Sequence, residues 1–149
     1  MALKERLQED WKQALKAREK FKANTISTAK AAILLVEKTD GRKLDDEEII
    51  EVLAKEVKQR REAILEFKKG NRQDLVDESE EEIKILLSYL PQQLTEDEIV
   101  EIVRQAIEEL GASSIKDMGK IMAVIVPKTK GRADGKLVSE IVKKSLNKQ

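Results

Sequence analysis

The stretch Thr95-Glu-Asp-Glu-Ile-Val-Glu-Ile-Val-Arg-Gln-Ala-Ile-Glu-Glu-Leu-Gly111 indicates the fold class, because it carries the signs of both ends of a helix. Thr95 and Glu98 have the spacing of a capping box, in which each side chain pairs with the other residue's free backbone N–H. Gly111 suits the left-handed position that commonly closes a helix. We therefore predict a helix over residues 96–110.

Two shorter helices are predicted on the C-terminal side of this stretch. Ser114 can cap a helix over residues 115–126, which we expect to end before Pro127. Asp134 can open a last helix that runs to about residue 147. Because helices of about a dozen residues are marginal alone, we expect the three to pack together as one unit.

The run Ile121-Met-Ala-Val-Ile-Val126 leaves one alternative open, because its β-branched residues would also suit a buried strand. A strand here, followed by Gly131-Arg-Ala-Asp-Gly135-Lys136 and a helix, would mimic a phosphate-binding loop. Such a loop needs four residues between its glycines and a Ser or Thr after its lysine, whereas this one has three residues and Leu137. The length of the run and the preceding Ser114 favour a helix, and we do not expect nucleotide hydrolysis.

Apolar residues repeat at helical spacing through the N-terminal part as well. Thr25 or Ser27 can cap the second helix, and Trp11 and Phe21 fall on the apolar side of the first, which favours core packing over base stacking. The pattern predicts four helices before Pro91, over about residues 2–24, 25–40, 45–69 and 73–90. The sequence as a whole predicts an all-α fold, with a helical N-terminal domain over residues 1–90 and a three-helix tail domain over residues 95–149.

The 149 residues include no cysteine and no histidine, although 39% of them are charged. These absences exclude disulfides, thiolate zinc sites, cysteine nucleophiles and histidine-dependent triads. Carboxylate runs at residues 45–48 and 78–82 lack the ligand spacing of a calcium loop, so we expect solvated helix surface there. We predict no catalytic residue, metal site or cofactor. The lack of a long apolar run and of a signal peptide predicts a cytoplasmic protein with no membrane partner.

Charge is unevenly distributed along a chain whose 29 basic and 29 acidic residues cancel. Residues 1–70 carry a net charge of +3, residues 71–110 of −9 and residues 111–149 of +6. Because local potential steers association, an acidic middle and a basic end suggest surfaces for different partners. An ordinary solvated helical surface is the alternative.

A basic loop is predicted between the last two helices. Cationic side chains beside the N-terminus of a helix suit the phosphates of a nucleic-acid backbone. The alternative is a plain solvated turn, in which Gly131 supplies backbone freedom and Asp134 caps the next helix. Both interpretations stay open on the residues alone. The candidate RNA-binding residues are Lys128, Lys130, Arg132 and Lys136, extended by Lys116 and Lys120 if the helices pack side by side.

Several segments resemble the GatB/YqeY family, and the whole chain is similar to a stand-alone YqeY-like protein. They are Leu90-Pro-Gln-Gln-Leu-Thr-Glu-Asp-Glu-Ile99, Ile115-Lys-Asp-Met-Gly-Lys-Ile-Met122 and Lys130-Gly-Arg-Ala-Asp-Gly-Lys-Leu-Val-Ser139, with Gly70-Asn-Arg-Gln-Asp-Leu75 in the N-terminal half. The resemblance implies a tail domain like the one at the end of the B subunit of the glutamine-dependent tRNA amidotransferase, where it touches the outer corner of the tRNA. The catalytic sites of that enzyme lie in other domains, and nothing in this sequence replaces them.

These observations together predict a non-catalytic tRNA-binding module that serves aminoacylation or tRNA-dependent amidation in translation. The expected partners are tRNA and, beside it, an aminoacyl-tRNA synthetase or amidotransferase protein, with no small-molecule substrate. Two alternatives stay open: an accessory component of a glutamine-dependent carbon–nitrogen ligase, and a protein-interaction scaffold that docks through the acidic residues 71–110.

Overall fold

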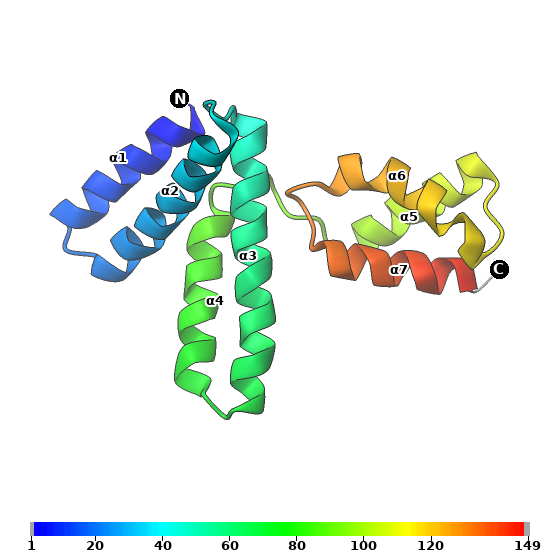
Figure 1. Ribbon diagram of the computed structural model, residues 1–149. Coiled ribbons are helices and arrows are strands. Elements are labelled where there is room, and N and C mark those ends of the chain that lie inside the picture. Colours follow the sequence, from blue (N-terminus) through cyan, green and yellow to red (C-terminus); the bar gives the residue numbers. More distant parts are fainter. Residues whose placement is uncertain (1, 148–149) are drawn as a thin grey trace. The chain divides into compact units, whose positions relative to one another are not determined.

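The computed structural model describes residues 2–147 and is helical over most of that range (Figure 1). No strand occurs within these residues, so the predicted all-α class is confirmed, and the run from Ile121 to Val126 is helical. The elements are α1 (Leu3–Lys16), α2 (Lys20–Asp40), α3 (Asp46–Lys69), α4 (Gln73–Leu87), α5 (Glu96–Leu110), the short 3₁₀ helix η1 (Ile115–Asp117), α6 (Met118–Thr129) and α7 (Gly135–Asn147).

The chain divides into two compact units between Pro91 and Gln92. Unit 1 contains α1 to α4, and unit 2 contains α5, η1, α6 and α7. Each unit buries an apolar core of its own. The core of unit 1 includes Leu7, Ile26, Ile33, Ile49, Leu53, Val57 and Leu86, and that of unit 2 includes Ile99, Val103, Ile121, Ile125, Val138, Val142 and Leu146.

In unit 1, α3 and α4 form a hairpin that packs against α2, and α1 lies along α2 (Figure 1). Tyr89, just after α4, donates its hydroxyl to Oδ2 of Asp10 over 2.5 Å, and the Arg6 guanidinium lies 4.6 Å from the ring centroid. Burial, and then the bond to Asp10, raise the pKa of Tyr89 above its ordinary value of 10.0. The hydroxyl therefore stays a proton donor at neutral pH and joins the first helix of the unit to the end of its last.

The first predicted helix is wrong in extent, because two helices replace it. α1 ends at Lys16 and α2 begins at Lys20, with Arg18 between them at a φ of 60°. The backbone N–H of Glu19 closes the turn by donating to the carbonyl of Ala14 over 2.9 Å. The break is hard to predict because an arginine, rather than a glycine, takes the left-handed conformation.

The cap and core positions predicted near this break are also wrong. Thr25 and Ser27 lie inside α2 rather than at its start, and the Thr25 hydroxyl donates to the carbonyl of Phe21 over 3.0 Å. Phe21 is exposed instead of buried. Trp11, by contrast, is half-buried and packs against the core of unit 1, as predicted.

Reciprocal caps are present at α3 and α5, and the one at α5 was predicted. The N–H of Glu48 donates to Oδ1 of Asp45 over 2.9 Å, and the N–H of Asp45 donates back to Oε1 of Glu48 over 3.2 Å. Thr95 and Glu98 form the same reciprocal pair at α5, with distances of 2.9 and 3.1 Å. Gly111 follows α5 with a φ of 63°, in the predicted left-handed conformation.

The end of α6 differs from the prediction, because the helix continues past Pro127 to Thr129. Proline has no N–H, so the carbonyl of Ala123 loses its helical donor. Ala123 and Pro127 are both exposed, and water can serve that carbonyl. The cost of the proline is therefore small enough for one more turn to form.

Glu37 is a buried charge that holds three parts of unit 1 together. Its side chain is only 8% exposed, and Oε2 accepts from the Lys4 ammonium on α1 and from the N–H of Leu44 over 2.9 Å. These two donors, Lys4 first, lower the pKa of the Glu37 carboxyl below its ordinary value of 4.5. The carboxylate stays ionised because both donors favour its charged form.

Replacing Glu37 with glutamine is expected to reduce the acid sensitivity of unit 1. Because the folded-state pKa lies below the unfolded value, the stability that Glu37 contributes is present above that value and is lost as the pH falls through the folded-state pKa. Thermal melts at about pH 7 and about pH 3 should therefore show a smaller fall in melting temperature for Glu37→Gln than for the wild type. Glu47→Gln, exposed on α3, is the control. An unchanged acid response in Glu37→Gln would contradict the assignment.

Candidate nucleic-acid interface

The predicted basic site lies in unit 2, where residues 130–134 connect α6 to α7. Gly131 opens this turn with a φ of 72°, and the N–H of Arg132 donates to the carbonyl of Thr129 over 2.9 Å. Oδ1 of Asp134 accepts from the N–H of Lys136 over 3.2 Å, which is the bond that a helix-capping side chain makes. The loop is thus an ordered turn at the N-terminus of α7.

A segment from the start of unit 2 holds this loop in place. The N–H of Leu94 donates to the carbonyl of Arg132 over 2.8 Å, and Nε2 of Gln93 donates to the carbonyl of Gly131 over 2.8 Å. Nε of Arg132 donates in turn to the carbonyl of Gln92 over 3.3 Å. Sequence reasoning missed both glutamines because they carry no charge and lie outside the predicted helices. Their place in the segment from Leu90 to Ile99 that carries the family resemblance was the only indication.

The six predicted cations are distributed over η1, α6, the loop that follows it and α7. Lys128 lies in the last turn of α6 and Lys136 in the first turn of α7, whereas Lys116 lies in η1 and Lys120 near the start of α6. At 1.5 Å per residue, Lys120 and Lys128 are separated by about 12 Å along the helix axis. All four lysines are exposed, and none takes part in an ion pair described for residues 2–147.

Arg132 differs from these lysines because it serves the unit's own structure. It is half-buried, and its guanidinium donates to the Gln92 carbonyl. The pKa of Glu98 is lowered mainly by bonds from Thr95, and the charge of Arg132 adds to this effect. A side chain used in this way is better suited to fixing the loop than to reaching a ligand. Lys130 is exposed at the end of α6.

The acidic and basic residues of unit 2 are concentrated in different parts of its sequence. α5 contains six carboxylates and one guanidinium, and Arg104 bonds to both Glu101 and Glu108. Residues 111–149 contain nine basic and three acidic side chains. The acidic residues of unit 2 are therefore concentrated in α5, and the residues after it carry a net positive charge.

The exposed side of α6 between its lysines is small and uncharged. Gly119, Ala123, Val126 and Pro127 are all exposed there. Next to and between Lys120 and Lys128, these exposed residues of α6 therefore carry no charge.

Unit 2 contains no aromatic residue, since Trp11, Phe21, Phe67 and Tyr89 all belong to unit 1. Base stacking on a ring is therefore excluded for this surface. Within residues 2–147, no group of three acidic residues could hold a metal ion. No helix in that part of the chain is both long and apolar enough to cross a membrane.

Replacing Gly131 with alanine is expected to destabilise unit 2 by about 1–2 kcal/mol, because a Cβ is strained at a φ of 72°. Gly119→Ala is the matched control: it lies inside α6, and a Cβ there would meet no atom within 4 Å. That change should stabilise the unit by about 0.5–1 kcal/mol. Urea unfolding followed by circular dichroism measures both, and equal effects would contradict the prediction.

A family profile described as "Yqey-like protein" matches residues 4–146. The chain belongs to the YqeY-like family. The resemblance carried by the sequence segments is thereby confirmed, and the match extends across both units.

Curated relatives match this family member over different lengths. The "Altered inheritance of mitochondria protein 41, mitochondrial" of Pyrenophora tritici-repentis is 32% identical over 138 residues, covering 91% of this chain and 76% of that protein. The protein of the same name from Lachancea thermotolerans is 36% identical over 87 residues, 58% of this chain and 46% of its own length. A subunit of the glutamyl-tRNA(Gln) amidotransferase of Thermococcus gammatolerans is 42% identical over 60 residues, 40% of this chain and 10% of that protein.

The predicted cytoplasmic location is contradicted by these relatives. The proteins from Pyrenophora tritici-repentis, Lachancea thermotolerans and Kluyveromyces lactis are named as mitochondrial. The prediction rested on the lack of a long apolar run and of a signal peptide. A charged protein of an aqueous organelle lacks them equally, so composition does not separate the two locations.

Proposed function

We propose that this protein is a non-catalytic tRNA-binding module whose unit 2 contacts the RNA backbone at the outer corner, or elbow, of the tRNA. The observation that carries the proposal is that four lysines on η1, α6 and α7 are exposed, none with an ion pair described within residues 2–147. Lysine binds phosphate as a point charge, so such a surface favours the sugar–phosphate backbone over base edges. The ordered loop at the start of α7 adds backbone N–H groups at a helix N-terminus.

The proposal assigns different roles to the two parts of the chain. The tail domain, residues 95–149, makes the RNA contact, and the helical N-terminal domain, residues 1–90, is free for other partners. The division between Pro91 and Gln92 and the two separate cores support this assignment. The expected partners beside tRNA are an aminoacyl-tRNA synthetase or an amidotransferase protein.

The partial match to an amidotransferase protein favours a second candidate, an accessory component of a glutamine-dependent carbon–nitrogen ligase. The matched 60 residues are a tenth of that relative, which is too little to include a whole enzyme. Incubation of the purified chain with glutamine, ATP and Glu-tRNA should therefore yield no Gln-tRNA. Turnover by the chain alone would replace the first candidate with an enzyme.

The scaffold alternative receives less support from the fold. Its acidic segment, residues 71–110, is divided between α4 of unit 1 and α5 of unit 2. The segment is therefore divided between two compact units, each with a core of its own.

Salt dependence is the direct test of the proposed RNA contact. Fluorescence anisotropy with labelled tRNA should show affinity falling roughly 50- to 150-fold between about 50 and 200 mM salt, if four lysines each release a counterion. Full-length protein is used throughout. Absence of binding at low salt, or an affinity that does not change with salt, would contradict the proposal.

A further inference from the structure

The loop that connects α6 to α7, residues 130–134, is held by a segment 38 positions earlier in the chain. Nε2 of Gln93 donates to the carbonyl of Gly131, and the N–H of Leu94 donates to the carbonyl of Arg132, each over 2.8 Å. Gly131 is buried, which limits the access of water to its carbonyl, so this carbonyl needs a protein donor. The conformation of the loop therefore depends on a side chain outside it.

The same loop leads into the first turn of α7, where Lys136 lies. Ala133 packs against the core of unit 2, and Oδ1 of Asp134 accepts from the N–H of Lys136 over 3.2 Å. Contacts at Gly131, Ala133 and Asp134 thus fix the backbone that precedes this lysine. Without the bond at Gly131 the backbone has more conformations, and the loop has to be ordered when a ligand binds.

The adjacent Gln92 has a different role, because only its backbone takes part in holding the loop. Its carbonyl accepts from Nε of Arg132 over 3.3 Å. Its side chain is exposed and has no hydrogen bond described within residues 2–147, whereas Gln93 is half-buried. Replacing Gln92 with alanine keeps the carbonyl, so the chain offers a matched control one residue away from Gln93.

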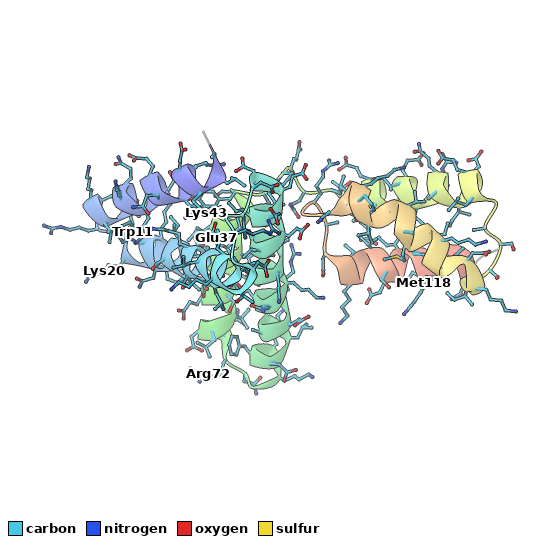
Figure 2. All side chains as sticks on the ribbon, turned by 45° about the horizontal axis from the view of Figure 1, so that its top comes forward. Trp11, Lys20, Glu37, Lys43, Arg72 and Met118 are labelled. Atoms are coloured by element: carbon cyan, nitrogen blue, oxygen red, sulfur yellow. The ribbon has the colours of Figure 1, made fainter. Side chains whose placement is uncertain are left out.

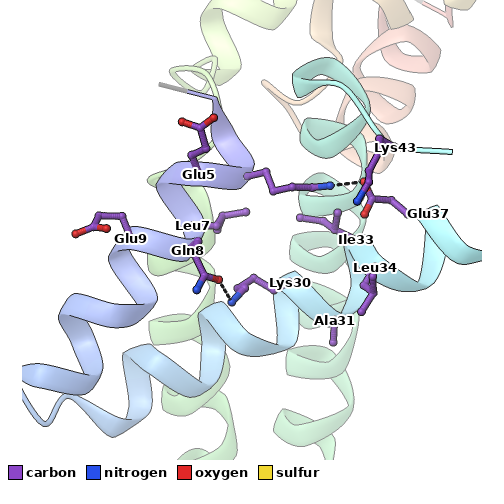
Figure 3. A pocket seen from close by; sticks show the side chains of 11 residues that line it. Glu5, Leu7, Gln8, Glu9, Lys30, Ala31, Ile33, Leu34, Glu37 and Lys43 are labelled. Carbon is purple, nitrogen blue, oxygen red and sulfur yellow. Dashed lines mark hydrogen bonds and ion pairs between the residues drawn. The ribbon is translucent and has the colours of Figure 1, made fainter.

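A second half-buried glutamine, Gln8, makes a bond between two elements of unit 1 (Figure 3). Its side chain accepts from the ammonium of Lys30, which also lies 4.3 Å from the centroid of the Trp11 ring (Figure 2). This contact joins α1 to α2, in the unit that does not contain the lysines proposed to bind RNA. Its loss therefore measures what a purely structural hydrogen bond of a glutamine contributes.

From these contacts we propose that Gln93 is a positioning residue for the RNA contact of unit 2. Its bond to the Gly131 carbonyl keeps the loop in the conformation that presents Lys136 to a phosphate of the RNA backbone. This inference rests on the proposed tRNA contact and adds an uncharged determinant to it. A loop that is ordered before binding loses little entropy at binding, so Gln93 raises the affinity without touching the RNA.

Anisotropy titrations of full-length variants with labelled tRNA test the proposal, with circular dichroism at the same temperature to verify that each variant is folded. Gln93→Ala should weaken binding roughly three- to tenfold, the equivalent of one hydrogen bond. The slope of log affinity against log salt should stay that of the wild type, because no phosphate contact is lost. Gln93→Met, which keeps a long side chain but has no N–H donor, should behave in the same way. Gln92→Ala and Gln8→Ala should bind within about twofold of the wild type.

A double-mutant cycle with Lys136→Ala shows whether Gln93 acts through this lysine. When Lys136 is already alanine, Gln93→Ala should weaken binding less than about twofold, because no charge is left to misplace. An equal loss in both backgrounds, a lower salt slope in Gln93→Ala, or wild-type affinity in Gln93→Ala would overturn the inference while the wild type still binds tRNA. Absence of binding by the wild type would instead refute the proposed function, and this inference with it.

Discussion

Replacing Ile121 with alanine is expected to destabilise unit 2 by about 2–5 kcal/mol and to leave unit 1 at its wild-type stability. Ile121 on α6 is fully buried among side chains of α5 and α7. Removing three carbons from such a site forfeits their burial and leaves a cavity that the neighbours fill only in part. Because small folded units have only a few kcal/mol of stability in reserve, the loss approaches the entire stability of unit 2.

Two optical signals separate the units in this experiment. Trp11 fluorescence reports on unit 1, and far-ultraviolet circular dichroism reports on the helices of both. In urea, Ile121→Ala should show an early loss of part of the dichroism, with the Trp11 transition unmoved. Leu53→Ala, buried in unit 1, should shift the Trp11 transition instead. A Trp11 transition that moves equally in both variants would mean that the chain unfolds as one body.

Replacing Lys116, Lys120, Lys128 and Lys136 together with alanine is expected to weaken tRNA binding by roughly 10²- to 10³-fold at low salt. Each lysine lost from a phosphate contact should also lower the slope of log affinity against log salt by about one unit. Arg132 is left in place because its bond to the Gln92 carbonyl holds the loop. Anisotropy titrations with labelled tRNA measure both quantities.

A matched charge change in unit 1 is the control for this variant. Lys12, Lys16, Lys38 and Lys55 are exposed and take part in no ion pair described for residues 2–147, so their replacement by alanine removes the same net charge. That control should keep most of the wild-type affinity for tRNA if the four lysines of unit 2 make the contact. Equal losses in the two variants would show that total charge, rather than the surface of unit 2, governs binding.

Helix ends that are marked by capping residues were predictable from the sequence. The capping pair Thr95–Glu98 and the left-handed Gly111 mark the two ends of α5 in the structure, as predicted. The break around Arg18 was not predictable, because a residue other than glycine rarely takes the left-handed conformation and nothing in the local sequence marks it. This missed turn then misplaced Phe21 and Thr25.

The candidate site was predictable in composition but not in arrangement. The sequence locates Lys128, Lys130, Arg132 and Lys136 at one loop, and the structure has that loop at the N-terminus of α7. The sequence does not predict the hydrogen bonds that Gln93 and Leu94 make to the loop, because each bond joins residues 38 positions apart in the chain. The distance between Lys120 and Lys128 likewise depends on α6 being one continuous helix through Pro127.

The lack of aromatic rings in unit 2 bears on selectivity. The proposed contact of exposed lysines, with no aromatic ring to stack on bases, would recognise the shape and phosphates of an RNA rather than its base sequence. It would accept any transcript folded to the same outline. Selection of one isoacceptor over another would then depend on a partner protein. This chain would contribute affinity for the RNA, and the partner would contribute selectivity.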